Sequence, residues 1–368
     1  MITEISCEER KLTVRLPADS YTIRDTLDKL RLYDSTDVKC KVTGCDADKT
    51  IEGLELSGDI YLINTLAKRL ESRERDMRDR LAVVKAMLKK DPDRDLTDLI
   101  KATYAKGELP VYRCGKMSEY ADLVIENRWL DEITNVLEQA IPFIDRQTVL
   151  MAMITREKGV FVDDYYVRLD DYTEPDVEIS VSRYDDSFFR LLIAPRDSDT
   201  DISGQWISLP QEYDKLTELA QCCSGETDEL QIIGFESVLP RAEPPSTVSI
   251  RSAEDFQEAA VKLGELTHRD ILKLKAVMES STPMSVGRII ELTDNLNRYD
   301  FISDTEYEDN EALVIVGGVM TPYGIISGLD QKIQLTSSQE QTSDEQYGHE
   351  DEAESEDESE DMGMGVIS

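Results

Sequence analysis

The chain has 368 residues, of which 77 are Asp or Glu and 41 are Lys or Arg, and its formal net charge is -36. This excess argues against direct binding to nucleic acid or anionic membranes, because every approach adds like charge. It favours partners with basic surfaces, such as grooves built to hold DNA or RNA. The same charge could instead serve only solubility.

Length and a hydrophobic share of 40% predict two or three globular domains. The opening residues lack the basic and then apolar pattern of a secretory signal, and no stretch approaches the roughly 18 apolar residues of a membrane span. We therefore expect a cytoplasmic protein without membrane contact. Its six cysteines are expected to be free thiols.

Hydrophobic periodicity predicts an α+β fold, an elongated array of small α/β segments. In the first half, strands are expected at 12–17, 38–42, 158–162 and 165–167, and helices at 21–32, 60–70, 81–88, 96–104, 118–128, 130–141 and 145–156. A β-hairpin is expected from 177–181 and 188–193, which flank a Tyr-Asp-Asp-Ser turn. In the second half, strands are expected at 207–210, 230–235, 318–320 and 324–326, and helices at 213–222, 256–266, 271–278 and 286–296.

The second half reads as an internal duplication of the first. Lys85 matches Lys275 at the same offset at which Ile100 matches Ile290 and Thr103 matches Thr293. Helix starts in this copy are expected at Ser252-x-x-Asp255, at Thr267-x-x-Asp270 and at Thr282 before Pro283. The second copy lacks most of a third segment that the first copy has.

The last forty residues differ from the rest. No Lys or Arg follows Lys332, and residues 340–361 contain twelve acidic side chains. A segment with a charge run and low hydrophobicity cannot offset its ordering entropy, so a disordered tail is predicted. The remaining body is still acidic.

These readings divide the chain into five parts. They are a first α/β segment (1–57), the helical segments of copy one (58–170), a hairpin with the second α/β segment (171–250), a truncated helical segment of copy two (251–330) and the tail (331–368).

The sequence supports no active site, metal site or cofactor. It has two histidines, His268 and His349, and neither has a Cys or Ser partner in its sequence context. Cys40 and Cys45 have near-metal spacing, but no second Cys/His pair follows within a short loop. No phosphate-binding glycine loop occurs. We therefore predict a protein that is not an enzyme.

Carboxylates fit a binding role better. Glu119, Asp122 and Glu126 lie at i, i+3 and i+7 on one predicted helix face, with axial steps of about 4.5 and 6 Å. Phosphates advance about 3.4 Å per step along one DNA strand, so such a row approximates them. The alternative is an ordinary solvated face. The candidate phosphate-mimicking set is Glu119, Asp122, Glu126, Asp131, Glu132, Asp163, Asp164, Asp170, Asp171, Asp185, Asp186, Asp304, Glu306, Glu308 and Asp309.

One segment has the opposite charge. Residues 68–90 carry nine basic and four acidic side chains. The mixed signs favour i, i+4 pairs on an exposed helix or packing against an acidic neighbour.

The order strand, Leu-Pro, helix, strand, followed by YLINTLAKRL, DLIKATY and PFIDRQTVLMAMITREKGVFVDDYYV, resembles the ArdA antirestriction proteins of mobile elements, most of all their longer tandem versions. The resemblance implies three small α/β segments, surface carboxylates that mimic bent DNA, and occupation of the DNA groove of Type I restriction-modification enzymes. It also implies a possible homodimer through 137–161. The truncated second copy, the hairpin and the acidic tail depart from the family pattern.

The expected function is thus that of a DNA-mimic antirestriction protein acting on a host DNA-targeting defence enzyme, with Type I restriction-modification as the first candidate. Two alternatives stay open. One is an acidic scaffold or chaperone for basic proteins, and the other is a DNA mimic aimed at another nuclease, such as a CRISPR effector.

Overall fold

A computed structural model describes residues 1–8, 10–33, 35–45, 49–72, 74, 76–157, 159–195, 204–222, 230–303, 313–316, 318–327 and 334–337. The fold is mixed α+β, as predicted. It divides into two compact units, Met1–Leu239 with Pro244–Ala260 and Pro240–Glu243 with Val261–Ser368. These units are coarser than the five predicted parts, whose boundaries stay predictions.

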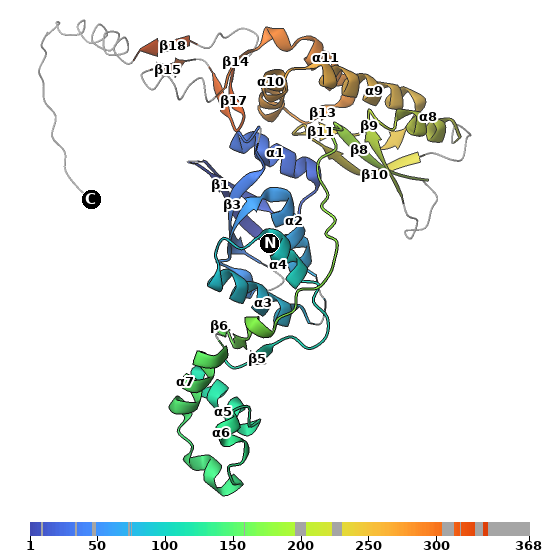
Figure 1. Ribbon diagram of the computed structural model, residues 1–368. Helices are drawn as coiled ribbons and strands as arrows, with labels where there is room; N and C mark the ends of the chain where they lie inside the picture. The colour runs from blue at the N-terminus through green and yellow to red at the C-terminus, as the bar shows by residue number, and fades with distance from the viewer. Residues whose placement is uncertain are drawn as a thin grey trace, which may run out of the picture. The chain divides into compact units, whose positions relative to one another are not determined.

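The first unit opens with an antiparallel sheet in the strand order β2-β1-β3-β4. Figure 1 labels its two central strands, β1 and β3. In β3, Val38, Cys40 and Val42 are buried while the lysines between them are exposed, because successive side chains point to opposite faces. The sequence reading missed β1, which pairs with both β2 and β3. The strands are β1 (Ile2–Cys7), β2 (Arg10–Arg15), β3 (Asp37–Gly44) and β4 (Glu55–Asp59).

Four helices complete the first core close to their predicted places. Three of them begin at an aspartate, Asp19, Asp59 or Asp95, whose carboxylate accepts a backbone N–H of the first turn. Such caps satisfy donors that the helix itself leaves unpaired and so fix where each helix starts. The helices are α1 (Ser20–Leu30), α2 (Ile60–Leu70), α3 (Met77–Lys90) and α4 (Leu96–Ala102).

A three-stranded sheet in the order β5-β7-β6 follows, with helices inserted between β5 and β6. The predicted helix at 130–141 is wrong, because only 131–134 is α-helical. The chain is extended at Leu137 and then forms a 3-10 turn that contains Pro142, whose ring is incompatible with a helix interior. The elements are β5 (Val111–Arg113), α5 (Met117–Glu126), α6 (Asp131–Thr134), η2 (Glu138–Phe143), α7 (Arg146–Glu157), β6 (Val160–Val162) and β7 (Tyr165–Val167).

The predicted hairpin at 177–193 is also wrong. After η3 (Leu169–Asp171), residues 172–186 form no strand. Ile179, Val181 and Tyr184 instead pack against the first core. An alternation of apolar and polar residues indicates that one face of the segment is buried. It does not indicate whether a sheet or a set of helices covers that face.

A second four-stranded antiparallel sheet has the order β12-β10-β8-β9. Phe189 of β8, Phe235 of β10 and Phe256 of α9 form its aromatic centre. Helix α9 begins at Ile250, so the predicted start at Ser252 is wrong. The elements are β8 (Phe189–Pro195), β9 (Gln205–Leu209), α8 (Tyr213–Cys222), β10 (Leu230–Ser237), β12 (Thr247–Val248) and α9 (Ile250–Glu265).

In the second unit, the predicted cap at Thr267 is confirmed, since its hydroxyl accepts the Asp270 backbone N–H. The start predicted at Pro283 is wrong, because Ser285 is the residue that precedes α11. The elements are β11 (Ala242–Glu243), α10 (His268–Glu279), β13 (Met284–Ser285), α11 (Val286–Asp294), η4 (Leu296–Arg298), β14 (Asp300–Ile302), β15 (Leu313–Val316), β16 (Val319–Thr321), β17 (Gly324–Ser327) and β18 (Gln334–Ser337).

The same topology occurs twice along the chain. The orders β2-β1-β3-β4 and β9-β8-β10-β12 have the same connections, and β5-β7-β6 matches β14-β17-β16. Lys85 of α3 contacts Asp163 in the β6–β7 turn, and Lys275 of α10 lies over the ring of Tyr323 in the β16–β17 turn. An internal duplication of the chain stays a prediction.

Of the predicted tail, residues 334–337 form β18, which pairs with β15. The rest of 331–368 lies outside the described residues.

Candidate partner-binding surface

The inserted helices around 115–157 rest on an aromatic cluster. The ring of Tyr120 packs at a tilt against that of Tyr166 with centroids 3.8 Å apart, and the ring centroid of Trp129 lies 4.8 Å from that of Tyr112. Phe161 closes the cluster at 4.7 Å from Tyr166. Helix α5 is thereby fixed to the β5-β7-β6 sheet through side chains of its inner face.

The outer face of α5 carries the predicted row of carboxylates. Glu119 accepts the Gly115 backbone N–H at 2.9 Å, and Asp122 forms a 2.5 Å ion pair with Arg146. Glu126 is exposed and has no ion-pair partner among the described residues. Two of the three carboxylates in the row therefore also hold the segment together.

Helix α6 and the residues after it continue this acidic surface. Asp131 and Glu132 are exposed, and Glu132 pairs with Arg156 of α7 at 3.1 Å. Asp145 lies at the start of α7, where its carboxylate accepts a hydrogen bond from the Thr148 hydroxyl at 2.6 Å. The hydrogen bonds that this carboxylate accepts lower the pKa of Asp145.

The acidic residues at the β6–β7 turn and in η3 face the basic helix α3. Asp163 pairs with Lys85 at 2.5 Å, and Asp170 pairs with Lys90 at 3.4 Å. One of the two expectations for residues 68–90, packing against an acidic neighbour, is therefore confirmed. Asp171 pairs with Arg168 at 2.6 Å, while Asp164 is exposed.

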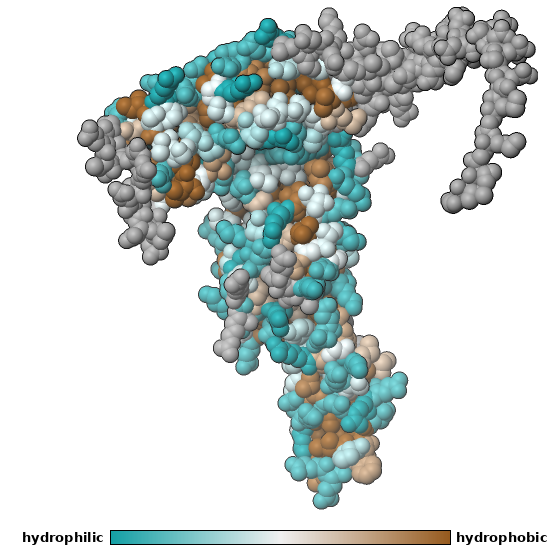
Figure 2. Space-filling view, turned by 180° about the vertical axis from the view of Figure 1, so that it is seen from behind, coloured by the Kyte–Doolittle hydropathy of each residue, from teal (hydrophilic) through white to brown (hydrophobic). Residues whose placement is uncertain are grey.

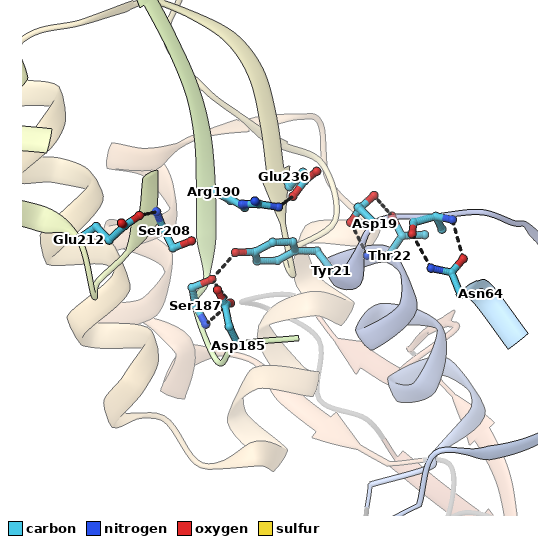
Figure 3. Close-up of polar contacts among 11 residues, drawn as sticks. Asp19, Tyr21, Thr22, Asn64, Asp185, Ser187, Arg190, Ser208, Glu212 and Glu236 are labelled. Atoms are coloured by element: carbon cyan, nitrogen blue, oxygen red, sulfur yellow. Dashed lines mark hydrogen bonds and ion pairs between the residues drawn. The ribbon is translucent and has the colours of Figure 1, made fainter. Parts of the chain in front are cut away.

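Asp185 is exposed, and its carboxylate borders a polar contact between α1 and the chain entering β8 (Figure 3). Its carboxylate accepts the Ser187 backbone N–H at 3.2 Å, and the Ser187 hydroxyl hydrogen-bonds the phenol of Tyr21. Burial raises the pKa of Tyr21 to about 12. Asp185 thus also stabilises this contact, and its neighbour Asp186 is likewise exposed, with a left-handed backbone, φ 59°.

Four members of the candidate set, Asp304, Glu306, Glu308 and Asp309, lie outside the described residues. The eleven others come from α5, α6, the β6–β7 turn, η3 and the approach to β8.

The ion-paired carboxylates keep much of their surface. Asp122 and Glu132 are 43% and 66% exposed, and Asp163, Asp170 and Asp171 lie between these values. Exposed pairs of this kind contribute about 0–1 kcal/mol. A lysine or arginine of a partner can therefore approach the same oxygens at little cost.

Large apolar side chains are exposed on the same segment. Leu137 is 75%, Phe143 is 87% and Met151 is 60% exposed. In Figure 2 brown side chains lie between teal ones on this segment. The sequence pattern did not single out these three residues, although a homodimer was expected through the range 137–161 in which they lie.

Among the described residues, Cys7, Cys40, Cys45 and Cys114 are free thiols. Cys40 and Cys45 are buried free thiols, and burial raises the pKa of Cys40 to about 11. Within the described part of the chain, no three His, Cys, Asp or Glu side chains are grouped as metal ligands. None of its helices combines the length and apolarity needed to cross a bilayer.

Comparison of the chain with protein-family models, with curated proteins and with solved structures found no match.

Proposed function

We propose that this protein is a cytoplasmic DNA mimic that inhibits a host DNA-targeting defence enzyme, in the first place a Type I restriction-modification enzyme. Its carboxylates would take the place of phosphates in a groove lined by Lys and Arg. The protein would thus compete with DNA without performing chemistry.

The observation that carries the proposal is the acidic surface of the α5–α7 segment. Seven carboxylates and four basic side chains lie between 115 and 156, and all seven carboxylates are exposed or half-exposed. The carboxylates are Glu119, Asp122, Glu126, Asp131, Glu132, Glu138 and Asp145. The aromatic cluster beneath α5 fixes this part of the surface, so little ordering entropy is lost on binding.

We further propose that this segment forms a homodimer through 137–161. Leu137, Phe143 and Met151 support this proposal, because exposed apolar side chains gathered on one segment are typical of protein interfaces. Leu137→Ser with Phe143→Ser should abolish a dimer seen by light scattering and leave the circular dichroism unchanged, since both side chains contribute little to the core. A dimer that survives in this variant would contradict the interface.

The inhibition test compares two double variants, each of which replaces two carboxylates by uncharged amides. Glu126→Gln with Asp131→Asn removes two carboxylates that have no ion-pair partner among the described residues. Asp214→Asn with Glu218→Gln removes two exposed carboxylates from α8 and is the matched control. The first pair should weaken inhibition of a purified Type I enzyme about threefold to tenfold, as expected for rim charges, and the control should not.

Binding should also weaken steeply with salt. The enzyme groove would release its bound counterions into solution when the mimic binds, as it does when DNA binds. A pull-down from a restricting host should recover a modification or specificity subunit that duplex DNA displaces. Binding that does not change between low and high salt would refute mimicry. Recovery of unrelated basic proteins, lost on deletion after Lys332, would favour an acidic chaperone instead.

A further inference from the structure

The second unit contains a cavity that is lined mainly by polar side chains. Its volume is about 510 Å³, and its lining comes from the α10–β13 connection, from α11 and from the residues of η4 and just after it. Cavities of roughly 300–1,000 Å³ are typical of sites that hold small organic molecules. The cavity is therefore large enough for such a ligand, and the chemistry of its lining indicates which kind.

Buried apolar side chains hold the elements around this cavity in place. Ile289 and Leu292 of α11 are buried, and so is Leu296 of η4. Met284 of β13 is also buried, and its backbone N–H donates to the Arg241 carbonyl at 2.9 Å. The polar side chains of the lining thus project from elements that are fixed by packing, as a pre-formed binding site requires.

Two arginines supply hydrogen-bond donors to the cavity, Arg288 from α11 and Arg298 from η4. Both are exposed, and neither guanidinium has a hydrogen-bond or ion-pair partner among the described residues. Thr282 and Tyr299 also line the cavity, and within the described part of the chain their hydroxyls are unpartnered as well. A guanidinium presents a rigid fork of N–H donors that matches the oxygens of phosphate and carboxylate groups. In a chain with a net charge of -36, two unpaired arginines at one cavity form a local site for an anion.

The same cavity also offers hydrogen-bond acceptors. Glu291 lines it, and its carboxylate forms no ion pair with any described residue. The Asn295 side-chain N–H donates to the Glu291 backbone carbonyl at 2.8 Å, which leaves the amide oxygen of Asn295 as an acceptor. The Ser281 hydroxyl donates to the Val277 carbonyl at 2.7 Å, so towards a ligand it can only accept. A ligand that satisfies this lining carries hydrogen-bond donors besides its anionic group.

We propose that this cavity binds a sugar phosphate, either by itself or as part of a nucleotide. The guanidinium groups of Arg288 and Arg298 hold the phosphate, and the carboxylate of Glu291 accepts hydroxyl groups of the sugar, as carboxylates do for ribose in dinucleotide-binding folds. A simple dicarboxylate would meet the same arginines, but it has no donor for Glu291. This inference does not depend on the proposed inhibition of a defence enzyme.

Isothermal titration calorimetry of the full chain with ribose 5-phosphate tests the site. We expect a Kd below about 1 mM, and ribose without the phosphate should give no measurable binding. Arg288→Gln with Arg298→Gln should weaken binding about tenfold or more, because each guanidinium supplies charge-assisted hydrogen bonds. Lys116→Gln with Arg251→Gln removes the same charge at exposed positions of the first unit and is the matched control. Both double variants should keep the melting temperature of the parent.

Pyrophosphate separates the role of the arginines from that of Glu291, because it carries phosphate groups without a sugar. Glu291→Met removes the carboxylate acceptors and one negative charge. It should leave pyrophosphate binding unchanged or stronger, and it should lower the affinity for ribose 5-phosphate relative to pyrophosphate about fivefold or more. An unchanged ratio of the two affinities would show an anion site that does not recognise the sugar, and it would overturn the proposal.

ADP distinguishes the two sources of the sugar phosphate. Binding about as tight as that of ribose 5-phosphate would assign the cavity to the sugar phosphate by itself, and binding about tenfold tighter or more would assign it to a nucleotide. No binding of ribose 5-phosphate or of ADP by the full chain would overturn the proposal. Equal affinity of the arginine double variant and its matched control would overturn it as well.

Discussion

Replacing Gly159 with alanine should loosen the segment that carries the acidic surface. An ideal Cβ at Gly159 would lie 2.7 Å from Cε2 of Tyr166, and the hydroxyl end of the ring would be closer still. Tyr166 is fully buried and its ring packs against that of Tyr120, so it cannot move aside without separating from α5. Overpacking of this kind lowers the free energy of unfolding by about 1–3 kcal/mol. We expect a loss of about 2 kcal/mol for Gly159→Ala, because the added Cβ meets a ring that is held in place.

Trp129 reports on this region, because it lies 4.8 Å from Tyr112 in the same aromatic cluster. The chain has two tryptophans, and Trp206→Phe leaves Trp129 as the one reporter. Urea unfolding followed by its fluorescence should show a lower midpoint for Gly159→Ala. An acidic surface that depends on this packing should then also inhibit its target less well.

A double-mutant cycle separates the clash from other effects. In a Tyr166→Leu background the side chain no longer reaches Gly159, so Gly159→Ala should cost less than 0.5 kcal/mol there. An unfolding free energy of Gly159→Ala within 0.5 kcal/mol of the parent would refute the packing argument, as would an equal loss in both backgrounds.

Three further predictions follow from described contacts. Arg80→Ala removes a 3.1 Å hydrogen bond to the Thr103 carbonyl and an ion pair with Glu74, and it should lower the unfolding free energy by about 2 kcal/mol in urea titrations; a loss under 0.5 kcal/mol would contradict a structural role. The buried phenol of Tyr21, with its pKa raised from 10 to about 12, stabilises the fold fully below pH 10, and this contribution is lost as the pH rises through 12. Tyr21→Phe should therefore flatten the fall in melting temperature over this range, and an unchanged fall would exclude Tyr21 as its source. Gly287→Ala in α11, where an added Cβ meets no atom within 4 Å, should raise stability by about 0.5–1 kcal/mol in thermal unfolding, and a loss would contradict the open space.

The ion-pair partners of the carboxylates were the features that the sequence predicted least. Glu119, Asp122 and Glu126 lie on α5 as their spacing predicted, yet Asp122 reaches Arg146, which is 24 residues away. Asp163 and Asp170 likewise meet lysines of α3 from about 80 residues away. Spacing along a helix gives the direction of a side chain, but it does not give the charge that the fold places opposite.

The sequence by itself determined the α+β class, most of the helices and part of the strands, although it missed β1. These features depend on local patterns, such as the aspartate caps of α1, α2 and α4 and the alternation in β3, and residues close in the chain produce them. Only the tertiary structure decided that 177–181 packs against the first core instead of forming a hairpin, and that Leu137 and Phe143 are exposed. Both outcomes depend on which surface a distant part of the chain provides for packing, and local sequence patterns do not specify that surface.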